Sequence, residues 1–224
     1  MTAMDRIGAL SGAAYFILAN AAIAVENDPA LPDAPTGQEI LDSWGRWASS
    51  PLVQAAISLE LFAFGAWMVF IGYVCWRVRD AGWLASAALV GGIVEIAVKI
   101  GSDAPLVTGF LLRAEISPEQ ALVLSQIGLV AFMVDLLPAG LFVLCAAAAA
   151  LKTQELGRAM AWTGVVIGAG NVTVAVVTGI NIGQSGFSPS FLLVLLWELV
   201  LSVYWGFFRS PAEKLAAAAT PRTS

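Results

Sequence analysis

Histidine is absent from the 224 residues of this sequence, and cysteine occurs only twice. Cys75 and Cys145 stand far apart in the chain, so they form neither a CxxC pair nor half of a zinc motif. Without histidine, haem loses its usual ligand, and a serine or cysteine triad loses its usual base. We therefore expect no metal site, no cofactor and no triad chemistry.

Charge is also scarce. Charged residues make up 12% of the chain and hydrophobic residues 59%, whereas about a quarter of an ordinary soluble domain is charged. The 16 acidic residues outnumber the 11 basic ones, so there is no basic stripe for nucleic acid, and no glycine-rich phosphate loop is present. The composition predicts an integral membrane protein that contacts the lipid bilayer, and it excludes nucleic acid as a partner.

Long apolar runs replace the missing charge. Each is long enough to cross a bilayer, and in lipid only a helix satisfies all of its own backbone groups. The six runs cover roughly residues 7–25, 51–76, 82–103, 119–151, 159–181 and 190–208. We therefore predict an all-α, polytopic bundle of six transmembrane helices in one domain, residues 1–209, followed by a disordered cytoplasmic tail, residues 210–224.

Basic residues indicate the orientation of these spans. If the N-terminus is cytoplasmic, only Arg46 and Arg113 fall in outer loops. The cytoplasmic segments then hold Arg6, Arg77, Arg79, Lys152, Arg158, Arg209, Lys214 and Arg222. The positive-inside rule therefore predicts that both termini are cytoplasmic. A cleaved signal peptide ending near Ala22 is the alternative for the first span, although its N-terminal region is weakly charged.

The longest predicted loop, residues 26–50, is acidic and proline-rich before it reaches the stretch "QEILDSWGRWASS". On a helix, the apolar residues Ile40, Leu41, Trp44 and Trp47 would share one side. We expect a short amphipathic helix here. It would either lie on the outer membrane surface or act as a lid over a site in the bundle.

Each helix that enters from the outside begins with Ser-Pro, at Ser50, Ser117 and Ser188. Serine caps a helix and proline suits its first position, so these are helix starts. In the second and sixth spans, a Glu-Leu pair follows nine residues after the proline, which places Glu60 and Glu198 at equal predicted depth. A duplicated hairpin is one explanation, and independent use of the same capping chemistry is the other.

Polar residues recur at similar depth in all six spans, 11 to 17 residues from the nearest cytoplasmic basic residue, or about 16 to 26 Å. They are Asn20, Glu60, Glu95, Asp135, Asn171 and Glu198. A charged side chain facing lipid there costs about 2.5 to 3.5 kcal/mol, so we expect the carboxyl groups to face the bundle interior. Four like charges cannot all be ionised in a medium of low dielectric, so some should be protonated.

The stretch "GGIVEIAVKIGSD" adds the single basic residue within a predicted span. Lys99 lies one helical turn from Glu95 and one turn from Asp103, on nearly the same helix face. The spacing favours a pair between Glu95 and Lys99, with Asp103 competing from the outer side. Lys99 would then be either a structural counter-ion or part of a gated path.

Three smaller features accompany the polar layer. The Gly8-x-x-x-Gly12 and Gly164-x-x-x-Gly168 patterns are typical of close helix packing. Pro138, three residues after Asp135, should kink the fourth span. Polar residues toward the outer side would either extend a wet vestibule or bond neighbouring helices; they are Ser125, Gln126, Asn181 and Gln184.

The opening stretch "DRIGALSGAAYFIL", the acidic outer loop and "LLPAGLFVLCAAAAALKTQELGRAMAWTGVVIGAGN" resemble a bacterial family of six-span membrane proteins known only as a domain of unknown function. The resemblance implies the six-span fold and a place in the bacterial plasma membrane. It implies no catalytic residue.

Three functions remain open. The first is an outward-facing polar cavity that binds or moves a proton, a cation or a small ligand; a carrier of this size would need a homo-oligomer. The second is a general-acid isomerase or cyclase acting on an apolar, lipid-like substrate, and the third is a non-catalytic subunit or sensor. For the first, the candidate binding residues are Glu60, Glu95, Lys99, Asp103, Asp135, Glu198, Asn20 and Asn171.

Overall fold

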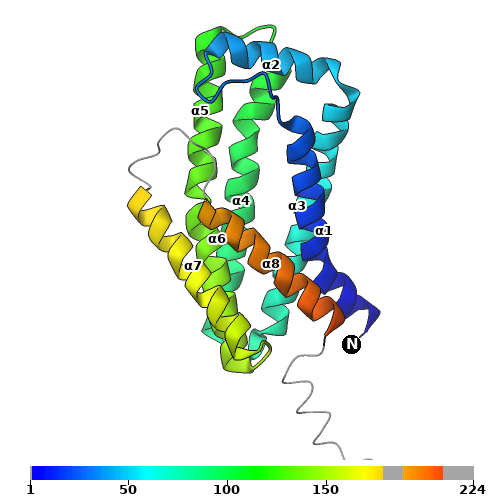
Figure 1. Cartoon of the computed structure of the whole chain (residues 1–224), viewed down its shortest axis with the longest axis vertical. Helices are drawn as coiled ribbons and strands as arrows, with labels where there is room; N and C mark the ends of the chain where they lie inside the picture. The colour runs from blue at the N-terminus through cyan, green and yellow to red at the C-terminus, as the bar shows by residue number, and fades with distance from the viewer. Residues whose placement is uncertain (1, 179–188, 209–224) are drawn as a thin grey trace, which may run out of the picture.

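The computed structural model describes residues 2–178 and 189–208, and within these ranges the chain is all-helical (Figure 1). The elements are α1 (Ala3–Glu26), α2 (Gly37–Ser49), α3 (Pro51–Arg77), the 3-10 turn η1 (Arg79–Ala81), α4 (Trp83–Leu112), α5 (Pro118–Val134), α6 (Leu136–Thr153), α7 (Arg158–Thr178) and α8 (Pro189–Phe207). Six of its helical segments are long and apolar enough to cross a membrane. The predicted fold class is confirmed, and the predicted tail lies outside the described residues.

The helix starts follow the predicted capping chemistry where they are described. The Ser50 hydroxyl accepts a hydrogen bond from Val53 N–H at the start of α3, and Ser117 and Gln120 form a capping box at the start of α5. Thr36 and Glu39 form another at α2. There, the backbone N–H of Thr36 donates to the Glu39 carboxylate and lowers its pKa. Ser188 lies outside the described residues.

The fourth span is two helices. α5 ends at Val134, Asp135 lies at the junction, and α6 begins at Leu136. Pro138 has no N–H to donate to the carbonyl four residues earlier, so the regular hydrogen-bond pattern is interrupted at this turn. The predicted kink therefore coincides with an interruption between two helices, and a carboxyl group lies where they meet.

Helix α2 forms a roof across the ends of α4 and α5 that the positive-inside prediction assigns to the outer side, called the outer ends below (Figure 1). Its apolar side is buried, with Ile40 and Trp44 each 3% exposed. Glycines make the close contact possible: a Cβ at Gly109 of α4 would lie 2.2 Å from the Trp44 ring. The salt bridge between Arg46 and Asp28, 2.6 Å long, fastens the preceding loop to this helix. The predicted amphipathic helix is therefore present, and its apolar side packs on the other helices of the bundle.

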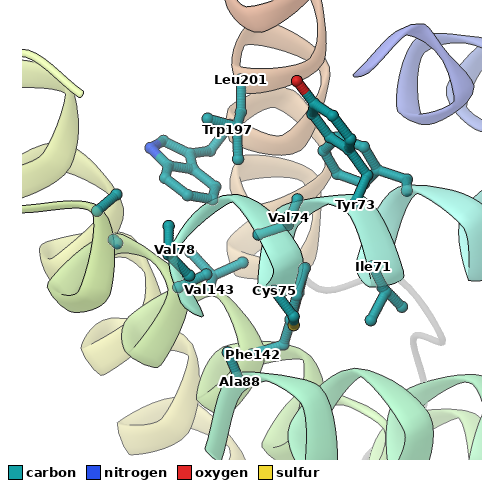
Figure 2. Close-up of a cluster of buried hydrophobic side chains, with 14 of the residues drawn as sticks. Ile71, Tyr73, Val74, Cys75, Val78, Ala88, Phe142, Val143, Trp197 and Leu201 are labelled. Atoms are coloured by element: carbon teal, nitrogen blue, oxygen red, sulfur yellow. The ribbon is translucent and has the colours of Figure 1, made fainter. Parts of the chain in front are cut away.

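Helices α7 and α8 pack against the upright helices but run obliquely to them. In Figure 1, α8 begins near mid-height of the bundle and runs obliquely to the end where α1 begins. It is anchored there by Ser202, whose hydroxyl donates to Ala9 O of α1 and accepts from Ala13 N–H. An apolar core, part of which is shown in Figure 2, includes Val74 of α3, Phe142 of α6 and Trp197 of α8.

Small residues let α6 and α7 approach closely, as the glycine pattern predicted. A Cβ at Gly168 would lie 2.4 Å from the backbone nitrogen of Leu144, whereas a Cβ at Gly170 would meet nothing within 4 Å. We expect Gly168→Ala to destabilise the protein by about 1 to 3 kcal/mol through overpacking. Gly170→Ala should be neutral or slightly stabilising, because alanine favours helix. Thermal unfolding of the two variants in detergent measures the difference, and equal melting temperatures would contradict the predicted tight contact.

Candidate functional site

A cavity of about 440 Å³ lies beneath the α2 roof, a volume within the range of small-molecule sites. α1, α3, α4 and α5 form its walls, and Trp47 of α2 closes part of its outer side. Most of its lining is apolar. The ionisable lining residues are Glu26, Asp33, Glu60, Lys99 and Asp103.

Lys99 is the cation of this cavity. Its Nζ lies 3.0 Å from Asp103 Oδ1 on the next turn of α4 and 3.7 Å from Glu60 Oε1 on α3. The Ser102 hydroxyl donates to the backbone carbonyl of Lys99, and two rings flank the ammonium, with the Phe132 centroid at 5.4 Å and the Phe64 centroid at 5.8 Å. We call Lys99, Glu60 and Asp103 the ion triad. It joins two helices at the edge of the cavity.

The expected pair between Glu95 and Lys99 is not formed. Both carboxyl oxygens of Glu95 are buried without a hydrogen-bond partner among the described residues, and the Lys99 ammonium turns outward to Asp103 instead. The physical reason is solvation. The side chains of Lys99 and Asp103 are 15% and 24% exposed, whereas Glu95 is 0% exposed. Turning toward the cavity spares the ammonium the cost of complete burial.

Acidic residues outnumber basic residues in the cavity lining. If the ion triad is fully ionised, one ammonium faces two carboxylates, and Glu26 and Asp33 add further acid to the lining. Glu26 is not among the predicted site residues, because the predicted first span ends one residue before it. The spacing could have indicated Glu26, because it follows the apolar residue Ala22 by four positions and therefore continues the same face of the first helix. The cavity lining therefore holds four acidic residues and one basic residue.

A second group of acids lies deeper, outside the cavity lining. Glu95, Asp135 and Glu198 are 0%, 1% and 2% exposed, and none of their carboxyl oxygens has a hydrogen-bond partner among the described residues. They interact electrostatically with one another and with Tyr15 of α1. We call these three residues the dry acid layer. They come from α4, the α5–α6 junction and α8.

The dry acid layer lies directly below the cavity. Glu95 is four residues before Lys99 on α4, and Asp135 is three residues after the cavity residue Phe132, so each lies about 4.5 to 6 Å deeper along its helix. Asp135 also interacts electrostatically with Lys99 and Asp103. An ionised carboxylate without a partner is very costly in such surroundings, so burial favours the protonated form of these acids.

The equal depth expected for Glu60 and Glu198 is wrong. Glu60 reaches the ion triad, whereas Glu198 joins the dry acid layer. Both residues follow the first proline of their helix by nine positions, but α8 begins near mid-height of the bundle and α3 begins under the roof (Figure 1). The same spacing from the proline therefore places Glu60 and Glu198 at different depths in the bundle.

The two asparagines have other surroundings. Asn171 is fully buried; its Nδ2 donates to Leu136 O of α6 at 2.6 Å and its Oδ1 accepts from the Ser190 hydroxyl at 2.7 Å. It thus ties α7 to α6 and α8. Asn20 is exposed on α1 and donates to Phe16 O of its own helix, so it does not join the layer. An uncharged amide costs less free energy at the lipid-facing surface of a helix than a carboxylate does. Asn20 can therefore stay on that surface.

Of the four outer polar residues, Ser125 and Gln126 line the cavity. The other two, Asn181 and Gln184, lie outside the described residues. Within the described ranges, no three histidine, cysteine, aspartate or glutamate side chains are placed to hold a metal ion together.

Fold and site together define a polytopic helical membrane protein with buried carboxyl groups. No known protein family, no curated protein and no solved structure matches the chain. The resemblance to a bacterial six-span family therefore stays a prediction, and function has to be argued from this chain's own residues.

Proposed function

We propose that the protein binds a small organic cation with one positive charge in an outward-facing cavity. The observation that carries the proposal is the ion triad: Lys99 is held between Glu60 and Asp103 at the edge of a 440 Å³ cavity. Within the ion triad, two carboxylates face one ammonium, and this excess of negative charge attracts a singly charged cation. The positive-inside prediction places this half of the bundle on the outer side.

The lining favours an organic cation over a bare metal ion. Metal ions such as Ca²⁺ require six or more oxygen ligands at short range. Here the walls are mostly hydrocarbon and aromatic, with Phe110 and Phe132 among them. An amine that carries a ring or a short alkyl chain would place its charge at the ion triad and its apolar part against these walls.

The alternative of a general-acid enzyme has less support. A catalytic acid must reach its substrate by a hydrogen bond or through one water molecule. Glu95, Asp135 and Glu198 are buried and do not line the cavity, so a substrate held there would not contact them. The subunit hypothesis requires an interior whose polar groups pair with one another, and the three acids are unpaired among the described residues.

Calorimetry on the full chain in lipid nanodiscs tests the proposal, with benzylammonium as probe and benzyl alcohol as its neutral counterpart. We expect saturable binding of the ammonium alone. Asp103→Asn and Glu60→Gln should each weaken binding about 10- to 100-fold, because a charge-assisted contact contributes about 1.5 to 3 kcal/mol.

Asp42→Asn and Glu115→Gln are the matched controls, since both side chains are exposed and neither lines the cavity. Both should bind as the unmodified protein does. Equal binding of benzyl alcohol, or equal losses in the controls, would overturn the proposal, and so would an absence of binding by every amine tested.

A further inference from the structure

Lys99 has acidic residues on both sides along one face of α4. Asp103 follows it by four residues and Glu95 precedes it by four, so a lysine side chain can reach either from the same backbone position. Only the outer contact is formed, at 3.0 Å. The inner carboxyl is fully buried and has no hydrogen-bond partner among the described residues.

We propose that Lys99 is a two-position switch that couples binding of a cation in the cavity to release of one proton from Glu95. The proposal rests on the cation-binding function above and adds the proton to it. In the outer position, Lys99 is paired with Asp103 and Glu60, and Glu95 is protonated. In the inner position, Lys99 is paired with the Glu95 carboxylate.

The exchange balances in charge and atoms. An arriving ammonium ligand takes the contacts of Glu60 and Asp103, and the Lys99 ammonium is displaced inward by one helical turn. Glu95 gives up its proton, which leaves through the cavity, and the new carboxylate pairs with Lys99. One cation enters and one proton leaves, so the net charge of the buried region does not change. Each carboxylate keeps a positive partner in both states, which avoids an unpaired buried charge.

The groups around Glu95 fit this role. Glu95 interacts electrostatically with Asp135 at the α5–α6 junction and with Glu198 of α8. Tyr15 of α1 interacts electrostatically with these three acids and with Glu60 of α3. All four are neutral or negative, so Lys99 is the nearby cation on which an ionised Glu95 would depend. Two ionised acids in the layer would repel each other, which limits release to one proton for each ligand bound.

The experiment measures proton release by calorimetry of benzylammonium binding in phosphate and in MOPS, two buffers with different ionisation enthalpies. We expect about one proton released per ligand. The dissociation constant should fall about tenfold for each unit of rising pH while the probe stays protonated.

Glu95→Gln should bind benzylammonium with no proton release and no pH slope, since glutamine resembles the protonated acid in shape and cannot ionise. Asp135→Asn and Glu198→Gln are the matched changes in the dry acid layer. Both variants should keep the proton release and the pH dependence of binding. Binding without proton release in the unmodified protein would overturn the switch and leave the proposed function standing. Loss of release in Asp135→Asn alone would overturn the assignment to Glu95, and absence of amine binding would overturn both proposals.

Discussion

Replacing Lys99 by methionine should tighten the binding of benzylammonium at least tenfold at neutral pH. Lys99 occupies the carboxylates that the ligand needs, with contacts of 3.0 Å to Asp103 and 3.7 Å to Glu60. Removing it takes away both the competitor and the repulsion between two positive charges. At about 5 Å and an effective dielectric constant near 20, that repulsion alone is about 3 kcal/mol.

The same substitution should destabilise the protein in the absence of ligand, because Glu60 and Asp103 would face each other without a counter-ion. Benzylammonium should then raise the melting temperature of Lys99→Met more than that of the unmodified protein. A lysine that served only to lock α3 to α4 would give a different result, namely lower stability with no gain in affinity.

Lys99→Arg is the control that keeps the charge. Its affinity for the probe should stay close to that of the unmodified protein, because a cation still competes for Glu60 and Asp103. Lys99→Met should also lose the pH dependence of binding, since no ammonium remains to pair with Glu95. Titration of the three proteins at two pH values separates these effects, and weaker binding by Lys99→Met would contradict the competition argument.

The spans were predictable from the sequence because their signals are local. Apolar length identified all six, the Ser-Pro starts located α3 and α5, and Pro138 located the break at Asp135. Each of these depends on a single segment and on the rule that backbone groups in lipid must bond within their own helix.

The partners of the charged residues were less predictable, because they depend on how helices are placed against one another. The outward turn of Lys99 follows from the position of the cavity, which four helices create together. The different depths of Glu60 and Glu198 follow from the height at which α8 begins (Figure 1). Spacing along one helix gave two acids within reach of Lys99, and tertiary structure decided between them.

The roof is the other part of the site on which a large effect is expected. Trp44 is 3% exposed and packs over Gly109, so its ring anchors α2 to the bundle. Trp44→Ala removes most of this contact, and truncation of a buried tryptophan costs about 3 to 5 kcal/mol. If that cost falls on the docking of α2, the helix should open roughly a hundred to several thousand times more often than in the unmodified protein.

Hydrogen exchange of the amides in residues 37–49 measures this opening. Trp83→Ala is the matched control, because Trp83 is 72% exposed at the other end of the bundle and should leave exchange in α2 unchanged. Gly109→Ala should also speed exchange in α2, because its methyl group would displace the Trp44 ring. Gly101→Ala should leave this exchange unchanged, because a Cβ there meets nothing within 4 Å.

Ligand kinetics distinguish a roof that only stabilises the bundle from one that controls access. Trp47 of α2 lines the cavity, so an undocked α2 opens its outer side to water. Benzylammonium should then both dissociate from and associate with the Trp44→Ala variant faster than with the unmodified protein. Faster exchange of the α2 amides with both ligand rates unchanged would show that the ligand enters by another route and that α2 is not a lid.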